Sequence, residues 1–419
     1  MNPKLKSQLS SLKQASFTLQ LSTKEQRNTA LRKIKKTLLE NIPKILKANQ
    51  KDLAKINEND PLYDRLLLND SRIKNICSEI ETVISLPDPL ERVLEEYNAP
   101  SGIHLRKVSV PLGCIGVIYE ARPNVSIDVA SLCLKSGNAV LLRGSSNAYE
   151  SNKTLVNLIH QSLKASEISK DSVQLLAPER KLADEMMQAN EYLDLIIPRG
   201  GQNLIKRVRE NSTVPIIETG ASVIHTFVDE SADFTMALNI IHNEKTRRPG
   251  VCNAADTVLV HENIAGNFLP KLAKKMKASQ TVLHCDRESF KILKPEYPVT
   301  LLKNDAANHY STEFLSLQMN IHIVKNIDEA ISHIRKYSLK HSESIVTKDK
   351  SNEEKFQREV DAACVYVNTS TAFSDGAQYG LGAEIGISTQ KLHARGPMGL
   401  RELCSYKWLV NSEGLIRLK

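Results

Sequence analysis

Short apolar runs of strand length alternate with amphipathic segments of helix length through most of the chain. In the first half, this pattern predicts strands at 114–119, 139–143, 173–176, 193–198 and 214–218. Helices are predicted between them at 125–135, 149–164, 180–189 and 202–210. A second series of strands is predicted at 223–228, 257–261, 299–302, 321–325, 344–347 and 364–368, with intervening helices such as 327–337. Because repeated strand–helix units build mostly parallel sheets, we predict an α/β fold with two consecutive open α/β domains.

The first hundred residues carry a different pattern. Apolar residues recur at helical intervals over 22–57, where Ser22 and Glu25 stand at the spacing of a capping box, so helices are predicted there. A further helix is predicted at 90–97, after two prolines. At 103–110, apolar and polar residues partly alternate, which predicts an exposed strand or hairpin able to reach a partner subunit.

Composition narrows the class of protein. The 419 residues are 41% hydrophobic, yet no apolar run approaches the length of about 18 residues needed to span a membrane, so no membrane segment is predicted. The N-terminal segment lacks the apolar core of a secretory signal, and the seven cysteines are scattered without a C-x-x-C pair. We therefore expect a cytoplasmic protein with reduced thiols and no metal site.

The net charge of +8 raises the question of a nucleic-acid partner. Lysine and arginine are spread along the chain among acidic residues, and aromatic residues make up only 5% of it. A nucleic-acid-binding surface usually needs clustered basic charge or aromatic stacking platforms. We therefore expect no nucleic-acid partner.

Cys252 is the first candidate for chemistry. It lies in Arg247-Arg248-Pro249-Gly250-Val251-Cys252-Asn253, a tight Pro-Gly turn between a predicted helix and a predicted strand. The two arginines would favour the thiolate, which is the nucleophilic form of the side chain. The alternative is a buried cysteine acting as a small hydrophobic residue, as most cysteines do. The local sequence leaves both interpretations open.

Two further segments place polar groups after predicted strands, where open α/β sheets bind ligands. In 113–124, Arg122 and Asn124 could bind an anion or donate to an oxyanion, although Asn124 could equally cap the following helix. In 142–147, the turn with Arg143, Ser145 and Ser146 could hold a phosphate, although a plain strand–helix loop looks the same.

A glycine-dense segment at 375–386 begins like a dinucleotide fingerprint. Gly380 and Gly382 fit, but Ile385 stands where the third glycine belongs, and no predicted strand directly precedes the segment. We reject a Rossmann motif and expect a loop that approaches a ligand or another segment closely. The G-x-x-x-x-G-K-[ST], H-E-x-x-H and G-x-S-x-G motifs are also missing from the sequence, which argues against the common kinase, zinc-protease and serine-hydrolase classes.

Three segments together resemble the gamma-glutamyl phosphate reductase family, within the aldehyde dehydrogenase superfamily. They are 116–124, 245–254 and 380–399, the last of which includes the specific run G-I-S-T-Q-K-L-H-A-R-G-P-M-G at 386–399. The resemblance extends over nearly the whole chain. It implies NADPH-dependent reduction of a small-molecule substrate, gamma-glutamyl phosphate, to glutamate 5-semialdehyde and phosphate, the second step of proline biosynthesis from glutamate.

The resemblance implies three parts. Residues 1–98 and 112–220 would form an NADPH-binding domain, 221–396 a catalytic domain with the nucleophilic cysteine, and 99–111 with 397–419 a small β element for homo-oligomerisation. This agrees with the exposed strand inferred above. A contact with the upstream glutamate 5-kinase stays open, as does the choice between dimer and tetramer.

By resemblance, Cys252 is the catalytic nucleophile that forms a thioester, and Asn124 donates to the oxyanion together with the backbone N–H of Cys252. The candidates for substrate binding are Arg122, Arg248, Asn253 and Arg395. Which arginine holds the substrate carboxylate stays open.

The cofactor residues also follow from the resemblance. Arg143 stands where the superfamily has a lysine at the adenosine ribose, and Ser146 stands where NAD-preferring relatives often place a glutamate. Together with Ser145, these residues could receive a 2′-phosphate. Because Ser146 does not repel a 2′-phosphate as a carboxylate would, NADPH is predicted. The turn near the pyrophosphate is matched by Gly200 and Gly201, and the glutamate at the nicotinamide ribose by Glu313.

An oxidising aldehyde dehydrogenase is the main rival function. Such an enzyme hydrolyses its thioester with an activated water, and Glu218 resembles the general base for that step. Its neighbours Thr219 and Ala221 depart from the usual Glu-Leu-Gly-Gly pattern, and the substrate-side motifs match the reductases. The rival from another class is a catalytically silent scaffold or RNA-binding relative, against which the intact Cys252 segment and the dispersed basic charge argue.

Overall fold

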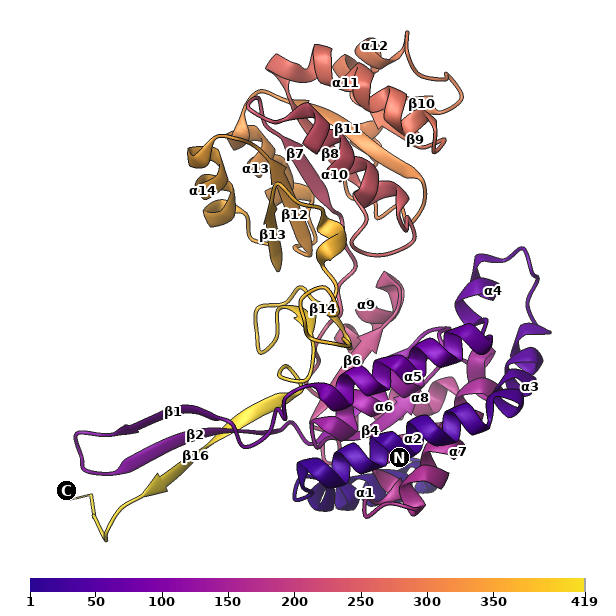
Figure 1. Cartoon of the computed structure of the whole chain (residues 1–419), viewed down its shortest axis with the longest axis vertical. Helices are drawn as coiled ribbons and strands as arrows, with labels where there is room; N and C mark the ends of the chain where they lie inside the picture. The colour runs from indigo at the N-terminus through magenta and orange to yellow at the C-terminus, as the bar shows by residue number, and fades with distance from the viewer. Residues whose placement is uncertain (418–419) are drawn as a thin grey trace. The chain divides into compact units, whose positions relative to one another are not determined.

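The computed structural model describes residues 1–417, and the chain divides into two compact units. Unit 1 comprises Met1–Thr219, Gly380–Gly386 and Pro397–Lys419, of which 418–419 lie outside the described residues. Unit 2 comprises Gly220–Tyr379 and Ile387–Gly396. The chain therefore returns to unit 1 after unit 2, as the yellow C-terminal segment in Figure 1 shows. Two short strands, β14 (Gly386–Ser388) and β15 (Gly396–Met398), pair where the chain passes between the units.

A four-stranded parallel sheet lies at the centre of unit 1, in the order β5-β4-β3-β6. Its strands are β3 (Cys114–Tyr119), β4 (Ala139–Arg143), β5 (Val173–Leu175) and β6 (Leu195–Arg199). The helices after them are α6 (Val125–Lys135), α7 (Tyr149–Lys164), α8 (Arg180–Met187) and α9 (Gln202–Asn211). Nearly every side chain of β3 and β4 is buried, as is typical of parallel strands covered on both faces.

The predictions for this sheet are largely confirmed, because the predicted bounds of β3, β4, α6 and α7 are those of the structure. The predicted strand at 214–218 is wrong. Only Ile216 pairs there, through a single bridge to Ile196.

Five helices precede the sheet of unit 1. They are α1 (Pro3–Leu19), α2 (Lys24–Glu40), α3 (Ile42–Leu53), α4 (Pro61–Leu66) and α5 (Asp70–Ser85). The sequence analysis missed α1, whose leucines at positions 5, 9 and 12 are buried in one core cluster with residues of β3 and β4. The predicted capping box was placed one residue too early: Thr23 caps α2 and exchanges hydrogen bonds with Gln26.

A separate antiparallel sheet of unit 1 contains β1 (Val93–Asn98), β2 (His104–Pro111) and β16 (Cys404–Asn411), with β2 in the middle. The strand predicted at 103–110 is confirmed, although Arg106 is the only residue of β2 that is exposed as a whole, and the helix predicted at 90–97 is wrong. The segment is a strand because it pairs with β2, where Lys107 forms an ion pair with Glu95 (2.8 Å) and lies 4.2 Å from the ring centre of Tyr406. Such cross-strand partners do not show in a local periodicity.

Unit 2 contains a seven-stranded parallel sheet in the order β10-β9-β11-β8-β7-β12-β13. The strands are β7 (His225–Val228), β8 (Thr257–His261), β9 (Val282–Cys285), β10 (Leu302–Lys303), β11 (Gln318–Val324), β12 (Ser342–Val346) and β13 (Cys364–Val367). The helices are α10 (Phe234–Thr246), α11 (Glu262–Lys277), α12 (Arg287–Leu293), α13 (Ile327–Tyr337) and α14 (Lys350–Glu359).

Successive residues of β8 belong to two different core clusters. Val258 and Val260 pack with α10 and α11, whereas Leu259 packs with α13 and α14. The sheet is therefore buried on both faces, which accounts for the continuous apolar run in the sequence. The strand predicted at 257–261 and the helix predicted at 327–337 are confirmed, whereas β9 was missed.

Candidate active site

Cys252 lies in the turn between α10 and β8 of unit 2 and is half-buried. The other six cysteines of the chain all lie in the described part and are buried. Burial raises the pKa of Cys77 and Cys114 to about 11 and that of Cys285 and Cys404 to about 12, which disfavours their thiolates. Cys252 is therefore the thiol of this chain best placed to meet a substrate.

The ends of the Cys252 turn are joined by a buried charged pair. Lys245, in the last turn of α10, lies 3.9 Å from Asp256, which precedes β8. Asp256 also accepts hydrogen bonds from the backbone N–H groups of Ile224 (3.2 Å) and Phe314 (3.1 Å). Burial lowers the pKa of Lys245 and raises the pKa of Asp256. The pair of Lys245 and Asp256 was not predicted from the sequence, although Lys245 lies in 245–254, one of the segments that resemble the reductase family.

A second support comes from the short helix η4 (Thr371–Phe373). The Thr371 hydroxyl donates to the backbone oxygen of Asn253 (2.9 Å), and the Asn253 amide donates to the backbone oxygens of Ala372 (3.3 Å) and Ser374 (3.0 Å). The backbone N–H of Thr371 in turn donates to the buried Glu244 carboxylate (2.8 Å). Asn253 thus holds the turn next to the nucleophile, and its predicted contact with substrate stays a prediction.

The other predicted residues of unit 2 lie in different settings. Arg248 is exposed at the start of the Cys252 turn. Glu313 accepts hydrogen bonds from the backbone N–H (3.2 Å) and hydroxyl (3.1 Å) of Ser222, and burial raises the pKa of Glu313. Arg395 forms an ion pair with Asp361 (2.8 Å). The described structure therefore leaves the substrate role of Arg395 a prediction.

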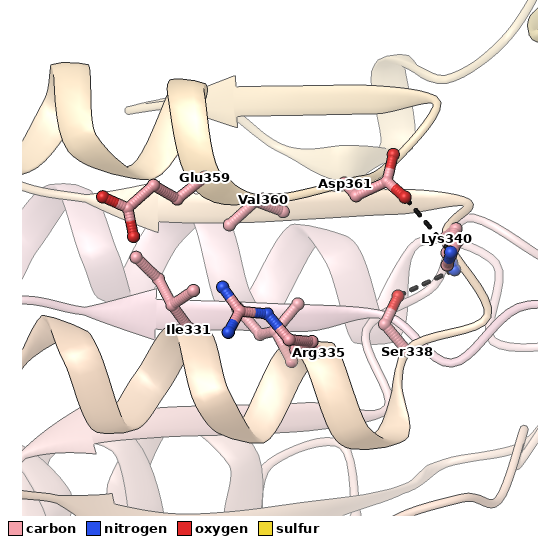
Figure 2. A pocket seen from close by; sticks show the side chains of 8 residues that line it. Ile331, Arg335, Ser338, Lys340, Glu359, Val360 and Asp361 are labelled. Atoms are coloured by element: carbon pink, nitrogen blue, oxygen red, sulfur yellow. Dashed lines mark hydrogen bonds and ion pairs between the residues drawn. The ribbon is translucent and has the colours of Figure 1, made fainter.

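Asp361 borders a hollow of about 220 Å³ in unit 2, drawn in Figure 2. Besides Arg395, the lysines Lys340 (3.1 Å) and Lys391 (3.2 Å) form ion pairs with this carboxylate. The hydrogen bonds from the three cations hold the pKa of Asp361 well below its usual range. None of the residues lining the hollow is a predicted site residue, so the hollow is not part of the candidate active site.

In unit 1, Asn124 precedes α6 at the end of β3. Its side chain makes no capping hydrogen bond to α6, so the alternative of a simple helix cap is not supported. Its amide instead donates to Asp128 (2.9 Å), whose pKa burial and the nearby Glu79 charge raise to about 7. Arg122, two residues before Asn124, is exposed.

The turn after β4 holds two buried polar atoms that have no hydrogen-bond partner in the described structure. They are Nε of Arg143 and Oγ of Ser145; the Arg143 Nη2 group donates to the backbone oxygen of Pro178 (2.9 Å). Ser146, which begins the short helix η1 (Ser146–Ala148), is exposed. Because buried polar groups in folded proteins normally have a partner, this turn fits an anionic ligand such as the predicted 2′-phosphate.

The turn before α9 contains Gly200 and Gly201. The backbone N–H of Gly201 donates to the carboxylate of Glu120 (2.9 Å), and a Cβ atom at Gly200 would lie 2.7 Å from that carboxylate. A helix start of this kind attracts anions, and glycine lets the carboxylate approach the backbone. In the described structure the Glu120 carboxylate takes this Gly201 donor, so the pyrophosphate contact of the turn stays a prediction, and the contact of Glu120 was missed from the sequence.

The glycine-dense loop also behaves as expected. Gly382 has a positive φ of 78°, and a Cβ atom there would lie 2.8 Å from Leu86. The loop does approach another segment closely, which only glycine permits at this position.

The sequence model of the aldehyde dehydrogenase family matches residues 10–290, a stretch that includes the turns after β3 and β4 and the Cys252 turn. The chain belongs to the aldehyde dehydrogenase family. It is 52% identical to a protein of Chlorobium luteolum named gamma-glutamyl phosphate reductase, over 86% of each chain. It is 47% identical to the protein of the same name from Chlorobium limicola over 100% of both chains.

The fold is likewise shared with a solved structure. The crystal structure of gamma-glutamyl phosphate reductase from Thermotoga maritima matches with a TM-score of 0.94 and 46% identity, covering 99% of this chain and 100% of that one. The predicted aldehyde dehydrogenase fold and the resemblance to the gamma-glutamyl phosphate reductases are therefore confirmed. Across residues 1–417, every helix falls short of the length and apolar character needed to cross a membrane.

Proposed function

We propose that this chain reduces gamma-glutamyl phosphate to glutamate 5-semialdehyde and phosphate with NADPH, as the second step of proline biosynthesis. The observation that carries the proposal is the half-buried Cys252 on its braced turn, in a chain 47% identical over its whole length to a relative named for this reduction. Membership of the aldehyde dehydrogenase family supports an oxidoreductase with a nicotinamide cofactor.

The reaction would pass through a covalent intermediate on the cysteine. The Cys252 thiolate attacks the acyl carbon of the substrate, the bond from that carbon to the phosphate oxygen breaks, and phosphate leaves a thioester. A bound nicotinamide supplies the hydride that reduces the thioester carbonyl. The C–S bond then breaks, the aldehyde is released, and the Cys252 thiolate is restored. None of these reaction steps uses water as a reactant, so no residue has to activate a water molecule.

Two N–H groups are proposed to stabilise the oxyanion. One is the backbone N–H of Cys252, and the other belongs to the Asn124 side chain. An amide group carries two N–H donors, and Asp128 takes one of them, which orients the Asn124 side chain and leaves a second donor for an oxyanion. Substrate binding is proposed for Arg122, Arg248, Asn253 and Arg395.

The residues proposed to hold the cofactor are Arg143, Ser145, Ser146, Gly200, Gly201 and Glu313. The unpartnered Arg143 Nε and Ser145 Oγ support a 2′-phosphate site, to which Ser146 adds no repelling charge. The turn of Gly200 and Gly201 would face the pyrophosphate, and Glu313 the nicotinamide ribose. Selection of NADPH over NADH is the consequence proposed for this set.

Homo-oligomerisation is proposed through the β1-β2-β16 sheet. All six residues of β1 are exposed, and so are Tyr406, Trp408 and Val410 of β16. Large apolar side chains left in solvent on a paired sheet are typical of protein interfaces. Docking of glutamate 5-kinase and a cytoplasmic location stay predictions.

The reverse reaction tests the proposal. The purified chain is mixed with glutamate 5-semialdehyde, phosphate and NADP⁺, and NADPH absorbance is followed. We expect a signal that requires phosphate. A signal of the same size without phosphate would instead identify an oxidising aldehyde dehydrogenase. No signal either with or without phosphate would refute the proposed activity.

A further inference from the structure

Three metal-ligating side chains of unit 2 meet away from the Cys252 turn. His284 lies on β9, next to the edge strand β10, and Asp305 and His309 flank the short helix η3 (Ala306–Asn308). One ligand atom from each residue lies within 4.8 Å of those of the other two. We propose that these residues form a zinc site that is separate from the proposed reaction.

The ligand atoms of the three residues lie close enough together for one ion to bind all of them. His284 Nδ1 lies 2.7 Å from one Asp305 carboxylate oxygen, and His309 Nε2 lies 3.5 Å from the other. In a tetrahedral site with bonds of about 2.1 Å, neighbouring ligand atoms are about 3.4 Å apart. An ion between the three groups therefore needs only small side-chain movements. Two imidazoles and one carboxylate are also a donor set that suits Zn²⁺.

The hydrogen bonds around His284 favour a cation. Its Nε2 atom faces the side-chain oxygen of Gln318 (3.1 Å), and the Gln318 amide nitrogen donates to Ser316 (3.0 Å). With Gln318 in this orientation, Nε2 must carry the hydrogen, and a neutral ring then turns a lone pair at Nδ1 toward the Asp305 carboxylate. A metal ion could take this lone pair, with the Asp305 carboxylate beside it as a second ligand.

The surroundings match those of a metal-bound histidine. A metal-ligating imidazole usually gives its other nitrogen to an outer hydrogen-bond partner, which Gln318 provides here. Phe314 stacks on the His284 ring with centroids 5.1 Å apart and fixes its plane. His284 is nearly buried, whereas Asp305 and His309 keep 34% and 32% of their side chains exposed. The ion would therefore be reached from solvent, and water can complete four ligands.

The site would tie a loop to the sheet. β10 has only two residues, and of the segment 304–317 only η3 is regular. This segment carries Phe314 and Glu313. Zinc held between His284 and His309 would fix the segment to β9, so binding is expected to raise the thermal stability of the folded chain.

Zinc titration of the full chain tests the proposal. The chelator-treated protein is titrated with ZnCl₂ by calorimetry, and its unfolding temperature is measured with and without Zn²⁺. The same experiments use His309→Ala, Asp305→Asn and Gln318→Ala. Cys252→Ala controls for zinc bound by the thiol, and His104→Ala, an exposed histidine paired with Glu96, controls for loss of any histidine.

We expect one equivalent of Zn²⁺ that survives Cys252→Ala and His104→Ala. His309→Ala and Asp305→Asn should lose both the binding and the stabilisation, and Gln318→Ala should weaken the affinity roughly 10- to 100-fold as an outer partner does. Because Asp305 and His309 are partly exposed, these variants should still fold, which their unfolding transitions without Zn²⁺ check. Zinc binding that is absent, that disappears with Cys252 alone, or that is unchanged in His309→Ala would overturn the site.

Discussion

Replacement of Thr371 separates support of the Cys252 turn from general stability. Thr371 is fully buried, and its hydroxyl donates to the backbone oxygen of Asn253, next to the nucleophile (2.9 Å). Thr371→Val keeps nearly the same volume but removes this donor. Thr371→Ser is the matched control, because it keeps the donor and removes one methyl group.

The two substitutions are expected to cost similar amounts of stability but very different amounts of activity. Thr371→Val leaves a carbonyl oxygen without its donor, which costs about 1–3 kcal/mol of unfolding free energy, whereas the methyl lost in Thr371→Ser costs roughly 1 kcal/mol. The valine variant also frees the Asn253 backbone. Because a displacement of about 1 Å at a reacting group can cost about 100-fold in rate, we expect kcat/KM to fall about 10- to 100-fold in Thr371→Val and less than about threefold in Thr371→Ser.

Three measurements check this reasoning. The phosphate-dependent reverse reaction gives kcat/KM, and urea unfolding of each variant gives its stability. The rate of Cys252 alkylation by iodoacetamide reports on the thiol without any cofactor. Equal activity of the two variants at similar stability would show that Thr371 does not position the nucleophile, and the proposed support of the turn would be refuted.

Four further substitutions test other parts of the structure. Cys252→Ala should abolish turnover in both directions while NADPH binding persists. Glu218→Gln removes a carboxylate paired with Arg209 (3.4 Å) and should keep most of the phosphate-dependent activity, because the proposed reaction activates no water. Loss of activity in Glu218→Gln as complete as in Cys252→Ala would instead favour the water-dependent dehydrogenase. Arg143→Ala should weaken NADPH more than NADH in binding titrations, and equal weakening would show that the ribose site is misplaced. Burial lowers the pKa of His341 to about 4 from an ordinary 6.5, so the unfolded chain binds the extra proton first and stability falls as pH drops below 6.5. Between pH 7 and 5 this loss is roughly 2 kcal/mol, and it should be missing in the urea unfolding of His341→Gln; an unchanged pH dependence would exclude a buried neutral ring.

The sequence by itself determined most of the parallel sheets. Strands such as β3, β4 and β8 are buried on both faces, so their consecutive residues are nearly all apolar and the sequence alone predicts them. The helices α6, α7 and α13 repeat their apolar positions with helical spacing and were predicted with their observed bounds. The Cys252 turn was also recognisable, because its residues are contiguous and form part of a specific family motif.

Only the tertiary structure decided features that join distant residues. β1 was predicted as a helix because its own residues do not show the pairing with β2 that makes it a strand. The same holds for the contact of Glu120 with Gly201 and for the meeting of His284 with Asp305. Each of these depends on where chain segments are brought by packing, and a hydrogen bond or ion pair forms only when its atoms reach about 3 Å of one another. The periodicity of residues along the chain does not tell how far apart two segments lie in space, so these contacts can be identified only in the folded protein.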